Sequence, residues 1–274
     1  MSEPRRSSAI IPGSGGPITE RGLSVAYLPP PWRMRGRTLA VWFRLQDPDE
    51  ARRHVPPTVA MDDDPVVRAR FWDMTYDAVP GSTGGARGSR HFLEAVVAFP
   101  VRYGDIEGDY PTYMYADDWV YITAGRELQG WNVRGGQVDF DPEPPNGLAG
   151  GVALTGELRS DGRPIMRARL ELTGQRVESD DSEPPKWLTT KIIPDATRPG
   201  AQVGQLLSTG PERVNGRHVW QATADLIFGE SPRDELHHLA PREIVDAQYW
   251  SDVDITVGWA QVLRELGDEV WERA

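Results

Sequence analysis

The chain contains no cysteine and only two lysines, Lys186 and Lys191, among its 274 residues. The absence of cysteine excludes disulfides, thiolate catalysis and cysteine-ligated zinc or iron–sulfur sites. Because arginine forms no Schiff base and is effectively never deprotonated, a lysine-based mechanism has only these two candidates. No segment approaches the roughly 18–20 apolar residues of a membrane span.

The chain also has fewer basic than acidic residues, with 30 basic and 41 acidic ones and a net charge of −11. This balance argues against broad binding to nucleic acid or anionic lipid, because phosphate binding needs a basic face. Arg5 and Arg6 are not followed by an apolar run, so no signal peptide is expected. We therefore expect a cytoplasmic protein with neither nucleic acid nor membrane as a partner.

The chain divides into a predicted tail and one predicted domain. Residues 1–22 are rich in Ser, Gly, Pro and Arg and are predicted to be a disordered tail, while residues 23–274 are predicted to form a single domain. Apolar and β-branched patterning predicts strands over the following ranges: 37–45, 66–76, 92–102, 151–159, 164–176, 187–193, 201–208, 217–227 and 243–257. Many strands and few helices predict a mainly β (α+β) class with an antiparallel sheet.

Two helices are expected at the periphery of this sheet. Asp47-Pro48-Asp49-Glu50 has an N-cap aspartate, a proline at the first helical position and acids in the first turn, which predicts a short helix. Apolar residues repeat at helical spacing over 259–270, which predicts a C-terminal amphipathic helix.

Generic motifs supply little chemistry. The glycine-rich loop at 81–88 has no strand–turn–helix context, so a hairpin or lid is expected there rather than a phosphate cradle. His91 and Glu94 are three residues apart on a predicted strand and fall on opposite faces, so no joint metal site is expected. Asp62-Asp63-Asp64 is interpreted as a solvated turn, with a loose calcium site as the alternative. His237-His238 is interpreted as an exposed loop pair, with a ligand role as the alternative. Glu94 itself stands out, because it is a carboxylate inside an apolar strand.

An ordered series of short motifs resembles the acetoacetate decarboxylase family. The series is Gly108-Asp109-Tyr110, Met114-Tyr115 and Gly125-Arg126-Glu127-Leu128, supported by Arg52-Arg53-His54-Val55-Pro56, Phe99-Pro100-Val101, Lys191-Ile192-Ile193-Pro194 and Arg242-Glu243-Ile244-Val245. The resemblance covers about residues 25–270. It implies a β cone or barrel that encloses a small buried cavity, usually in a homo-oligomer. We expect a small-molecule substrate and neither a cofactor nor a metal.

The resemblance also identifies a departure from the family's chemistry. In the decarboxylases, a Pro-Lys-Lys follows the Arg-Glu-Leu motif, and its first lysine forms a Schiff base while the second lowers the pKa of the first. Val133 occupies the position of the first lysine and Arg134 that of the second. Valine has no nucleophile, so we expect no Schiff-base decarboxylation. Lys191 belongs to a motif that family members carry in addition to their catalytic lysine, so a structural role is expected for it.

Some of the family's other functional positions have the same residue type in this chain, and others do not. Arg37 matches an arginine associated with the substrate carboxylate, which suits a guanidinium because its fork binds carboxylate in a bidentate manner. Glu94 matches a buried glutamate implicated in catalysis, and Arg70 stands where the family has a second glutamate. Trp131 and Tyr113 are candidates for the cavity wall. We therefore name Glu94 and Arg134 as candidate catalytic residues, and the candidate substrate-binding residues are Arg37, Arg70, Tyr113, Trp131 and Val133.

Structural roles remain open for the same residues. Arg37 could form a salt bridge at a strand end, and Glu94 could be the buried partner of Arg126 or Arg134. If the pocket is catalytic, the chain is a lyase-type enzyme that uses acid–base chemistry for dehydration, cyclisation or imine-free decarboxylation. Its substrate would be a keto acid or a polyketide-like or aromatic metabolite of natural-product biosynthesis. The alternative is a protein that binds a small acid in the same cavity without turnover.

Overall fold

The computed structural model describes residues 18–19, 22–23, 28, 30–78, 89–177, 186–231 and 233–267. Within them, thirteen strands form one sheet in the order β15-β12-β11-β6-β5-β4-β3-β14-β13-β10-β9-β8, with β7 pairing beside β6. Its strands are β3 (Trp32–Leu45), β4 (Val67–Ala78), β5 (Arg90–Tyr103), β6 (Ile106–Ala116), β7 (Val133–Gly135), β8 (Gln137–Phe140), β9 (Ala153–Ser160), β10 (Arg163–Val177), β11 (Lys186–Pro194), β12 (Ala201–Thr209), β13 (Pro211–Phe228), β14 (Pro241–Val257) and β15 (Gln261–Glu265).

The remaining elements are short. The helical segments are α1 (Glu50–Arg53), α2 (Trp119–Ala124), the π-helical turn η1 (Gly125–Gln129) and the 3₁₀ turn η2 (Leu236–Leu239). The two-residue strands β1 (Ile18–Thr19) and β2 (Gly22–Leu23) pair with each other at the end of the predicted tail, most of which lies outside the described residues. The whole of the predicted glycine loop at 81–88 also lies outside them. None of the helices in the described ranges has the length and apolar character needed to cross a bilayer.

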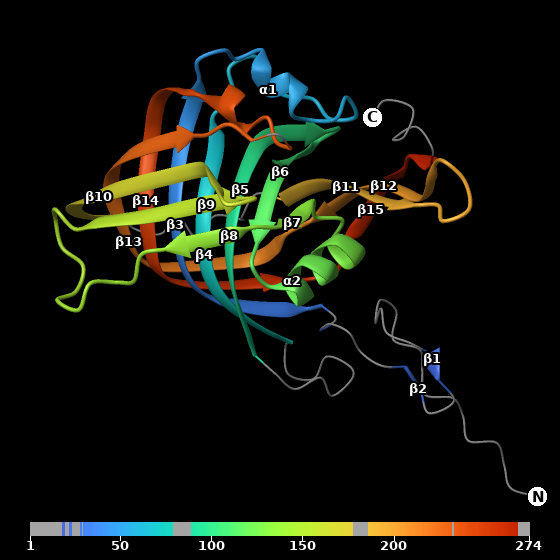
Figure 1. Cartoon of the computed structure of the whole chain (residues 1–274), viewed down its shortest axis with the longest axis horizontal. Coiled ribbons are helices and arrows are strands. Elements are labelled where there is room, and N and C mark those ends of the chain that lie inside the picture. The colour runs from blue at the N-terminus through green and yellow to red at the C-terminus, as the bar shows by residue number, and fades with distance from the viewer. Residues whose placement is uncertain are drawn as a thin grey trace, which may run out of the picture.

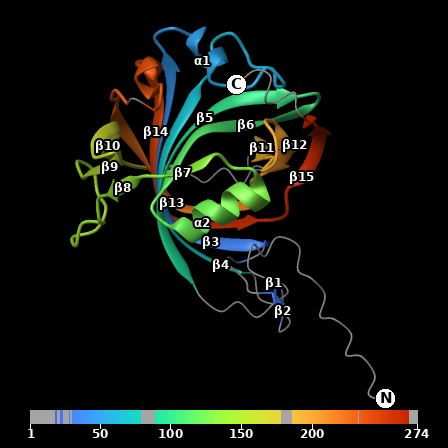
Figure 2. The ribbon, with the colours of Figure 1, turned by 45° about the vertical axis from the view of Figure 1, so that its right-hand side comes forward.

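The sheet confirms the mainly β class and all nine predicted strands, but it is neither wholly antiparallel nor a closed barrel. β6 pairs in parallel with both β7 and β11. The parallel β6–β7 pair arises because α2 and η1 return the chain to the same edge, as a crossover connection does. The order ends at β15 on one side and β8 on the other, and within the described ranges no pairing joins these two edges. Figure 2 shows the open sheet curling around α2 and β7.

The prediction of a C-terminal helix was wrong. Residues 268–270 of the predicted range lie outside the described residues. Within the described part, Gln261–Glu265 form β15, in which Val262 pairs with Leu207 and Glu265 with Gln205 of β12. Trp259 and Val262 are about half exposed, so the apolar repeat does not pack as a helix face. Hydrogen bonding to the free edge of β12 prevails over the helical spacing. The short helix predicted after Asp47 is confirmed as α1.

The central strands β3 to β6 carry two different apolar faces, because successive side chains of a strand point to opposite sides. We call the side with Leu39, Phe71 and Val97 the core face, since these residues belong to the larger buried cluster that also includes β9 and β10. The side with Trp72 and Phe92 is called the cavity face, and its buried cluster also includes residues of α2 and β7. In Figure 1, α1 and α2 lie toward opposite ends of these strands.

Candidate functional site

A cavity of about 410 Å³ lies on the cavity face, bounded by residues from β3, β4, β5, α2, β11, β13 and β14. Its wall is aromatic to an extent that composition did not reveal. Five of the ten tryptophans line it, together with Phe92 and Tyr121, and these tryptophans are Trp42, Trp72, Trp131, Trp187 and Trp250. Apolar walls with few polar groups are typical of small-molecule sites.

Glu94 lies on β5 and lines this cavity with only 2 % of its surface exposed. Its Oε1 atom accepts a hydrogen bond of 3.1 Å from the Tyr121 hydroxyl. Burial raises the pKa of Glu94 to about 8, and the Tyr121 hydrogen bond opposes this shift. Glu94 is therefore largely protonated at neutral pH, and no arginine pairs with it within the described ranges.

Helix α2 fixes the position of the Tyr121 hydroxyl. Asp118 caps the helix by accepting a hydrogen bond of 2.7 Å from the Tyr121 backbone N–H. Arg90 forms an ion pair with Asp118, and the Tyr121 ring stacks on Phe92 with centroids 3.9 Å apart. The hydroxyl that touches Glu94 is thus held by a capped helix and a stacked ring.

Arg70 lies on β4 and also lines the cavity. Its guanidinium carbon lies 5.8 Å from the ring centroid of Trp42 and 5.5 Å from that of Trp72. Within the described part of the chain, no hydrogen bond or ion pair reaches this guanidinium. Burial lowers the pKa of Arg70 to about 10, with Asp109 opposing the shift, so the group stays charged at neutral pH.

The other charged groups that line the cavity have partners. Arg68 forms an ion pair with the buried carboxylate of Asp109. Asp246 accepts hydrogen bonds of 2.6 Å from Gln221 and 2.8 Å from Gln248. Among the charged lining groups, Arg70 has no such partner in the described ranges and Glu94 has the single hydrogen bond from Tyr121, so these two keep hydrogen-bonding capacity for a ligand.

Trp131 and Val133 follow η1 and lie in the buried cluster of the cavity face. Gly130 ends η1 with a φ of 66°, a left-handed conformation that glycine adopts without steric cost. Trp131 lines the cavity and donates from its indole to Thr209 over 2.8 Å. Val133 is fully buried, packs near Gly125 and is not one of the residues that line the cavity.

Arg37 lies on the core face. Its side chain forms an ion pair of 2.7 Å with Asp73 and donates to the Asp141 carbonyl over 2.8 Å. The guanidinium carbon lies 4.6 Å from the Phe140 ring centroid. Arg37 is not a lining residue of the cavity, because its neighbour Thr38 takes the cavity side of β3.

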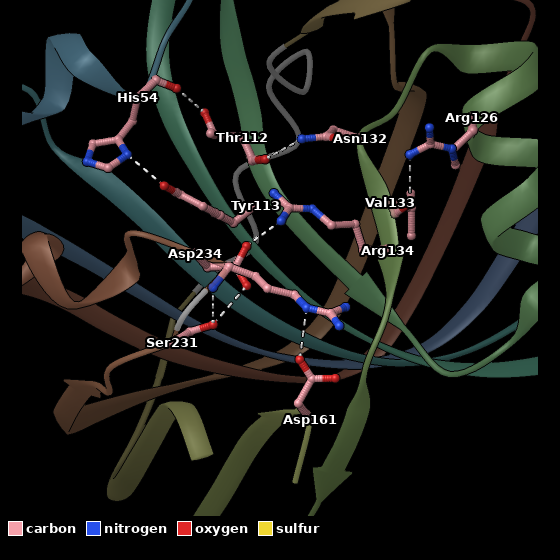
Figure 3. Close-up of polar contacts among 11 residues, drawn as sticks. His54, Thr112, Tyr113, Arg126, Asn132, Val133, Arg134, Asp161, Ser231 and Asp234 are labelled. Atoms are coloured by element: carbon pink, nitrogen blue, oxygen red, sulfur yellow. Dashed lines mark hydrogen bonds and ion pairs between the residues drawn. The ribbon is translucent and has the colours of Figure 1, made fainter. Parts of the chain in front are cut away.

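Arg134 and Tyr113 lie together on the core face, away from Glu94. Arg134 forms an ion pair with Asp234, as Figure 3 shows, and its guanidinium carbon lies 5.9 Å from the Tyr113 ring centroid. The Tyr113 hydroxyl lies 2.7 Å from Nδ1 of His54, whose Nε2 lies 3.1 Å from Glu50. Burial lowers the pKa of His54, so the neutral ring donates to Glu50 and accepts from Tyr113.

The seven predicted site residues therefore divide by face. Arg70 and Glu94 share the cavity with Trp131, while Val133 packs behind its wall. The structure does not bring Arg134 beside Glu94, because alternation on β7 directs Val133 inward and Arg134 to the other side. Arg37 and Tyr113 are separated from the cavity for the same reason.

Several lining residues were missed from the sequence. Trp72 could have been predicted, because a residue two positions after Arg70 on a strand points to the same face as Arg70. Tyr121 gave a weaker signal, namely the N-cap residue Asp118 ahead of a short helical run. Trp187 and Trp250 come from distant strands and gave no local signal.

The described residues hold no lysine in this cavity and no group of three metal-ligating side chains. Both lysines of the chain are described. Lys186 lines a separate surface pocket, and Lys191 is on β11 outside the set of lining residues.

Comparison with known proteins identifies the relatives of this chain. The family model described as "Acetoacetate decarboxylase (ADC)" matches residues 16–266. The acetoacetate decarboxylase of Paraburkholderia phytofirmans is 27 % identical over 266 residues, with 92 % of each chain covered. That of Clostridium beijerinckii is 25 % identical, with 97 % of this chain and 98 % of its own covered.

Solved structures share the fold at lower identity. The enduracididine biosynthesis enzyme MppR, complexed with the condensation product of pyruvate and imidazole 4-carboxaldehyde, has a TM-score of 0.79 at 22 % identity and covers 96 % of this chain and 99 % of its own. An acetoacetate decarboxylase-like enzyme from Sphingomonas wittichii RW1 has a TM-score of 0.78 at 17 % identity, with 92 % and 100 % covered.

Proposed function

Since the chain belongs to the acetoacetate decarboxylase family, a family of enzymes, we propose that it is a lyase-type enzyme of that family that works without a Schiff base. The substrate in this proposal is a keto acid or a polyketide-like or aromatic metabolite. The setting is secondary metabolism, as for the fold neighbour MppR, an enduracididine biosynthesis enzyme. The reaction is a dehydration, a cyclisation or an imine-free decarboxylation.

One observation carries the proposal: Arg70 and Glu94 line the same lysine-free cavity, and neither has an ionic partner within the described ranges. A guanidinium without a carboxylate partner is suited to bind the carboxylate of a substrate. A carboxyl group with a pKa of about 8 can exchange protons near neutral pH in either direction. Imine chemistry needs an amine, and Val133 has none.

The chemistry follows from these charge states. At pH 7, the protonated Glu94 acts as an acid toward a leaving hydroxyl group or a developing enolate. Its ionised form, which becomes the majority above a pH of about 8, removes a proton next to a ketone. Arg70 stabilises the negative charge that develops, in a site from which aromatic walls exclude water.

The other candidate residues take lesser roles in this proposal. Trp131 and Val133 shape the cavity, while Arg37, Tyr113 and Arg134 support the fold through their partners on the core face. Action in the cytoplasm as a homo-oligomer remains a prediction.

The proposal is tested by incubating the protein with acetoacetate, benzoylacetate, pyruvate and 4-phenyl-2-oxobutanoate and following products by NMR. We expect turnover of at least one acid, a loss of about 10²–10⁴-fold in Glu94→Gln, and no mass adduct after borohydride. Glu143→Gln is the matched control, because Glu143 also accepts a tyrosine hydroxyl, from Tyr249 at 2.6 Å, but is exposed and outside the cavity. A borohydride adduct, or full turnover in Glu94→Gln, contradicts the proposal. Saturable binding with recovery of unchanged acid identifies the non-catalytic alternative instead.

A further inference from the structure

The guanidinium of Arg70 lies over two indole rings on the cavity face. Its central carbon is 5.8 Å from the ring centroid of Trp42 and 5.5 Å from that of Trp72. Trp72 follows Arg70 by two residues on β4 and so points to the same side. Trp42 is the β3 partner of Arg68 and therefore lies diagonally across from Arg70, a position that long side chains can reach. Two strands thus each supply one ring to the same cation.

The direct cross-strand neighbours of Arg70 offer its guanidinium no acceptor. Arg70 pairs with Ala40 of β3 and with Val96 of β5, and neither side chain has a polar atom. Ala40 precedes Trp42 by two residues on the same face, and its methyl group occupies little of the space beside Arg70. The sheet around Arg70 therefore favours contact with the indoles over contact with a carboxylate.

Arg70 differs from the other arginines that lie over aromatic rings. The described part of the chain has four such arginines. Three of them also have a polar side-chain partner, namely Asp73 for Arg37, Asp234 for Arg134 and, at 3.3 Å, Nδ1 of His218 for Arg176. No such partner reaches Arg70 within the described ranges. A ring face attracts a cation but has no in-plane lone pair, so the five N–H donors of Arg70 are not used up by its two rings.

We propose that Trp42 is a positioning residue of a carboxylate site: together with Trp72 it holds the Arg70 guanidinium in place, and the N–H donors of Arg70 bind the carboxylate of a ligand in the cavity. This inference rests on the proposed function and adds the residue that orders its anion-binding group. Ordering the arginine before the ligand arrives strengthens binding, because less side-chain freedom is then lost on association. Trp42 acts through Arg70 and takes no part in proton transfer at Glu94.

The test separates the charge of a ligand from its shape. Benzoate and benzamide have the same ring and nearly the same size, but only benzoate is an anion at pH 7, so calorimetry of both gives the preference of the cavity for a carboxylate. In the wild type we expect benzoate to bind about 10–100-fold more tightly than benzamide, as for a charged hydrogen bond. Trp42→Leu should reduce this ratio about 3–30-fold, the range expected for a lost cation–π contact.

Matched variants distinguish positioning of Arg70 from a general effect on the wall. Trp187→Leu is the control, because Trp187 is also a partly buried tryptophan of the cavity wall, but no arginine lies over its ring in the described ranges. Its loss should weaken both ligands equally and leave the ratio unchanged. Arg70→Met should bring the ratio to about 1, and adding Trp42→Leu to it should change the ratio no further, because Trp42 acts through Arg70.

A second pair of variants keeps the inference testable if Trp42→Leu loses stability. Trp42 is only partly buried, and Trp42→Phe keeps a ring face, so this variant should retain most of the preference for benzoate. Pentafluorophenylalanine at the same position has a similar shape but a reversed ring quadrupole, and should lose that preference.

A ratio that is unchanged in folded Trp42→Leu, or in the fluorinated variant, overturns the role of Trp42. The proposed function stands in that case if Arg70→Met still abolishes the preference for benzoate. Wild-type protein that binds neither ligand, or binds both equally, overturns the inference as well. Turnover of a keto acid that is lost in Glu94→Gln would then still support the acid–base chemistry of the proposed function.

Discussion

On the core face of the central strands, Arg37 meets Asp73 and Arg134 meets Asp234, whereas on the cavity face Arg70 and Glu94 have no ionic partner in the described ranges. The two faces belong to the same strands and differ by single-residue steps along them. Charged groups with a structural role form ion pairs, because a buried charge whose partner is missing destabilises the fold. Buried groups left unpaired cost stability, and perturbed titratable groups of this kind mark candidate functional sites.

The largest expected effect concerns Glu94 and the free energy of unfolding. The pKa of Glu94 is about 8 in the folded chain against an ordinary value of 4.5, so between these pH values the folded state binds the extra proton. The stability of the wild type therefore falls as pH rises through this window. Glu94→Gln cannot ionise, so its Tm should exceed that of the wild type at pH 9, with the difference shrinking toward pH 5. The Tm of Glu143→Gln should have the same pH dependence as that of the wild type. A difference in Tm between Glu94→Gln and the wild type that did not vary with pH would contradict the prediction that Glu94 is buried and unpaired.

The ion pair on the core face should matter for stability rather than for turnover. Arg134→Met leaves the carboxylate of Asp234, which is only 4 % exposed, without its cation. Because the Arg134 side chain is about one-third exposed, we expect a loss of about 1–3 kcal/mol in chemical denaturation rather than the full cost of a dry pair. Arg52→Met removes an exposed partner of Asp63 and should change stability little. Loss of turnover in folded Arg134→Met would contradict this prediction and indicate that Arg134 has a catalytic role.

The two arginines Arg70 and Arg37 give opposite expectations for binding of a keto acid. Arg70→Met removes the unpaired cation of the cavity and should raise KM about 10–100-fold, the range expected for a charged hydrogen bond. Arg37→Met removes the Asp73 ion pair on the other face and should lower the Tm while leaving KM within twofold. Steady-state kinetics of both variants measure these changes in KM. A raised KM in Arg37→Met with an unchanged KM in Arg70→Met would assign the carboxylate-binding site to Arg37.

The smallest effect is expected at Tyr121, whose hydroxyl lowers the pKa of Glu94 through its hydrogen bond. Tyr121→Phe removes that stabilisation of the carboxylate and should shift the inflection of the pH–rate profile to higher pH, with less than a tenfold change in kcat at its plateau. Tyr249→Phe, which affects the exposed Glu143, should leave the profile unchanged. A downward shift in Tyr121→Phe would mean that another group governs the profile.

The sequence was sufficient for most of the fold, because local patterning sets strand formation. Alternation over 37–45 and 66–76 predicted β3 and β4, and the short ordered motifs indicated the family. The apolar repeat at 259–270 led to the wrong prediction of a helix. The open edge of β12 offers backbone hydrogen-bond partners to this segment, and no local pattern reveals them. Closure of the barrel likewise depends on the registers of distant strands.

The site was predicted less completely than the fold, since it depends on which way each side chain points. Glu94, Arg70 and Trp131 could be found from motif positions, and all three line the cavity. Arg134 was named from its match to the family motif, and the three residues of β7 are too few for a pattern to show that it lies on the face away from Glu94. The five tryptophans of the wall converge from β3, β4, β11, β14 and the turn after η1, and such convergence is a property of topology.

The concentration of indoles around one chamber has a practical consequence. Half of the tryptophans of the chain border the same space, so a ligand that enters it alters the surroundings of several fluorophores at once. Intrinsic emission should therefore report occupancy directly, without a label or a coupled assay. Libraries of natural organic acids could be screened in this way before any product is known.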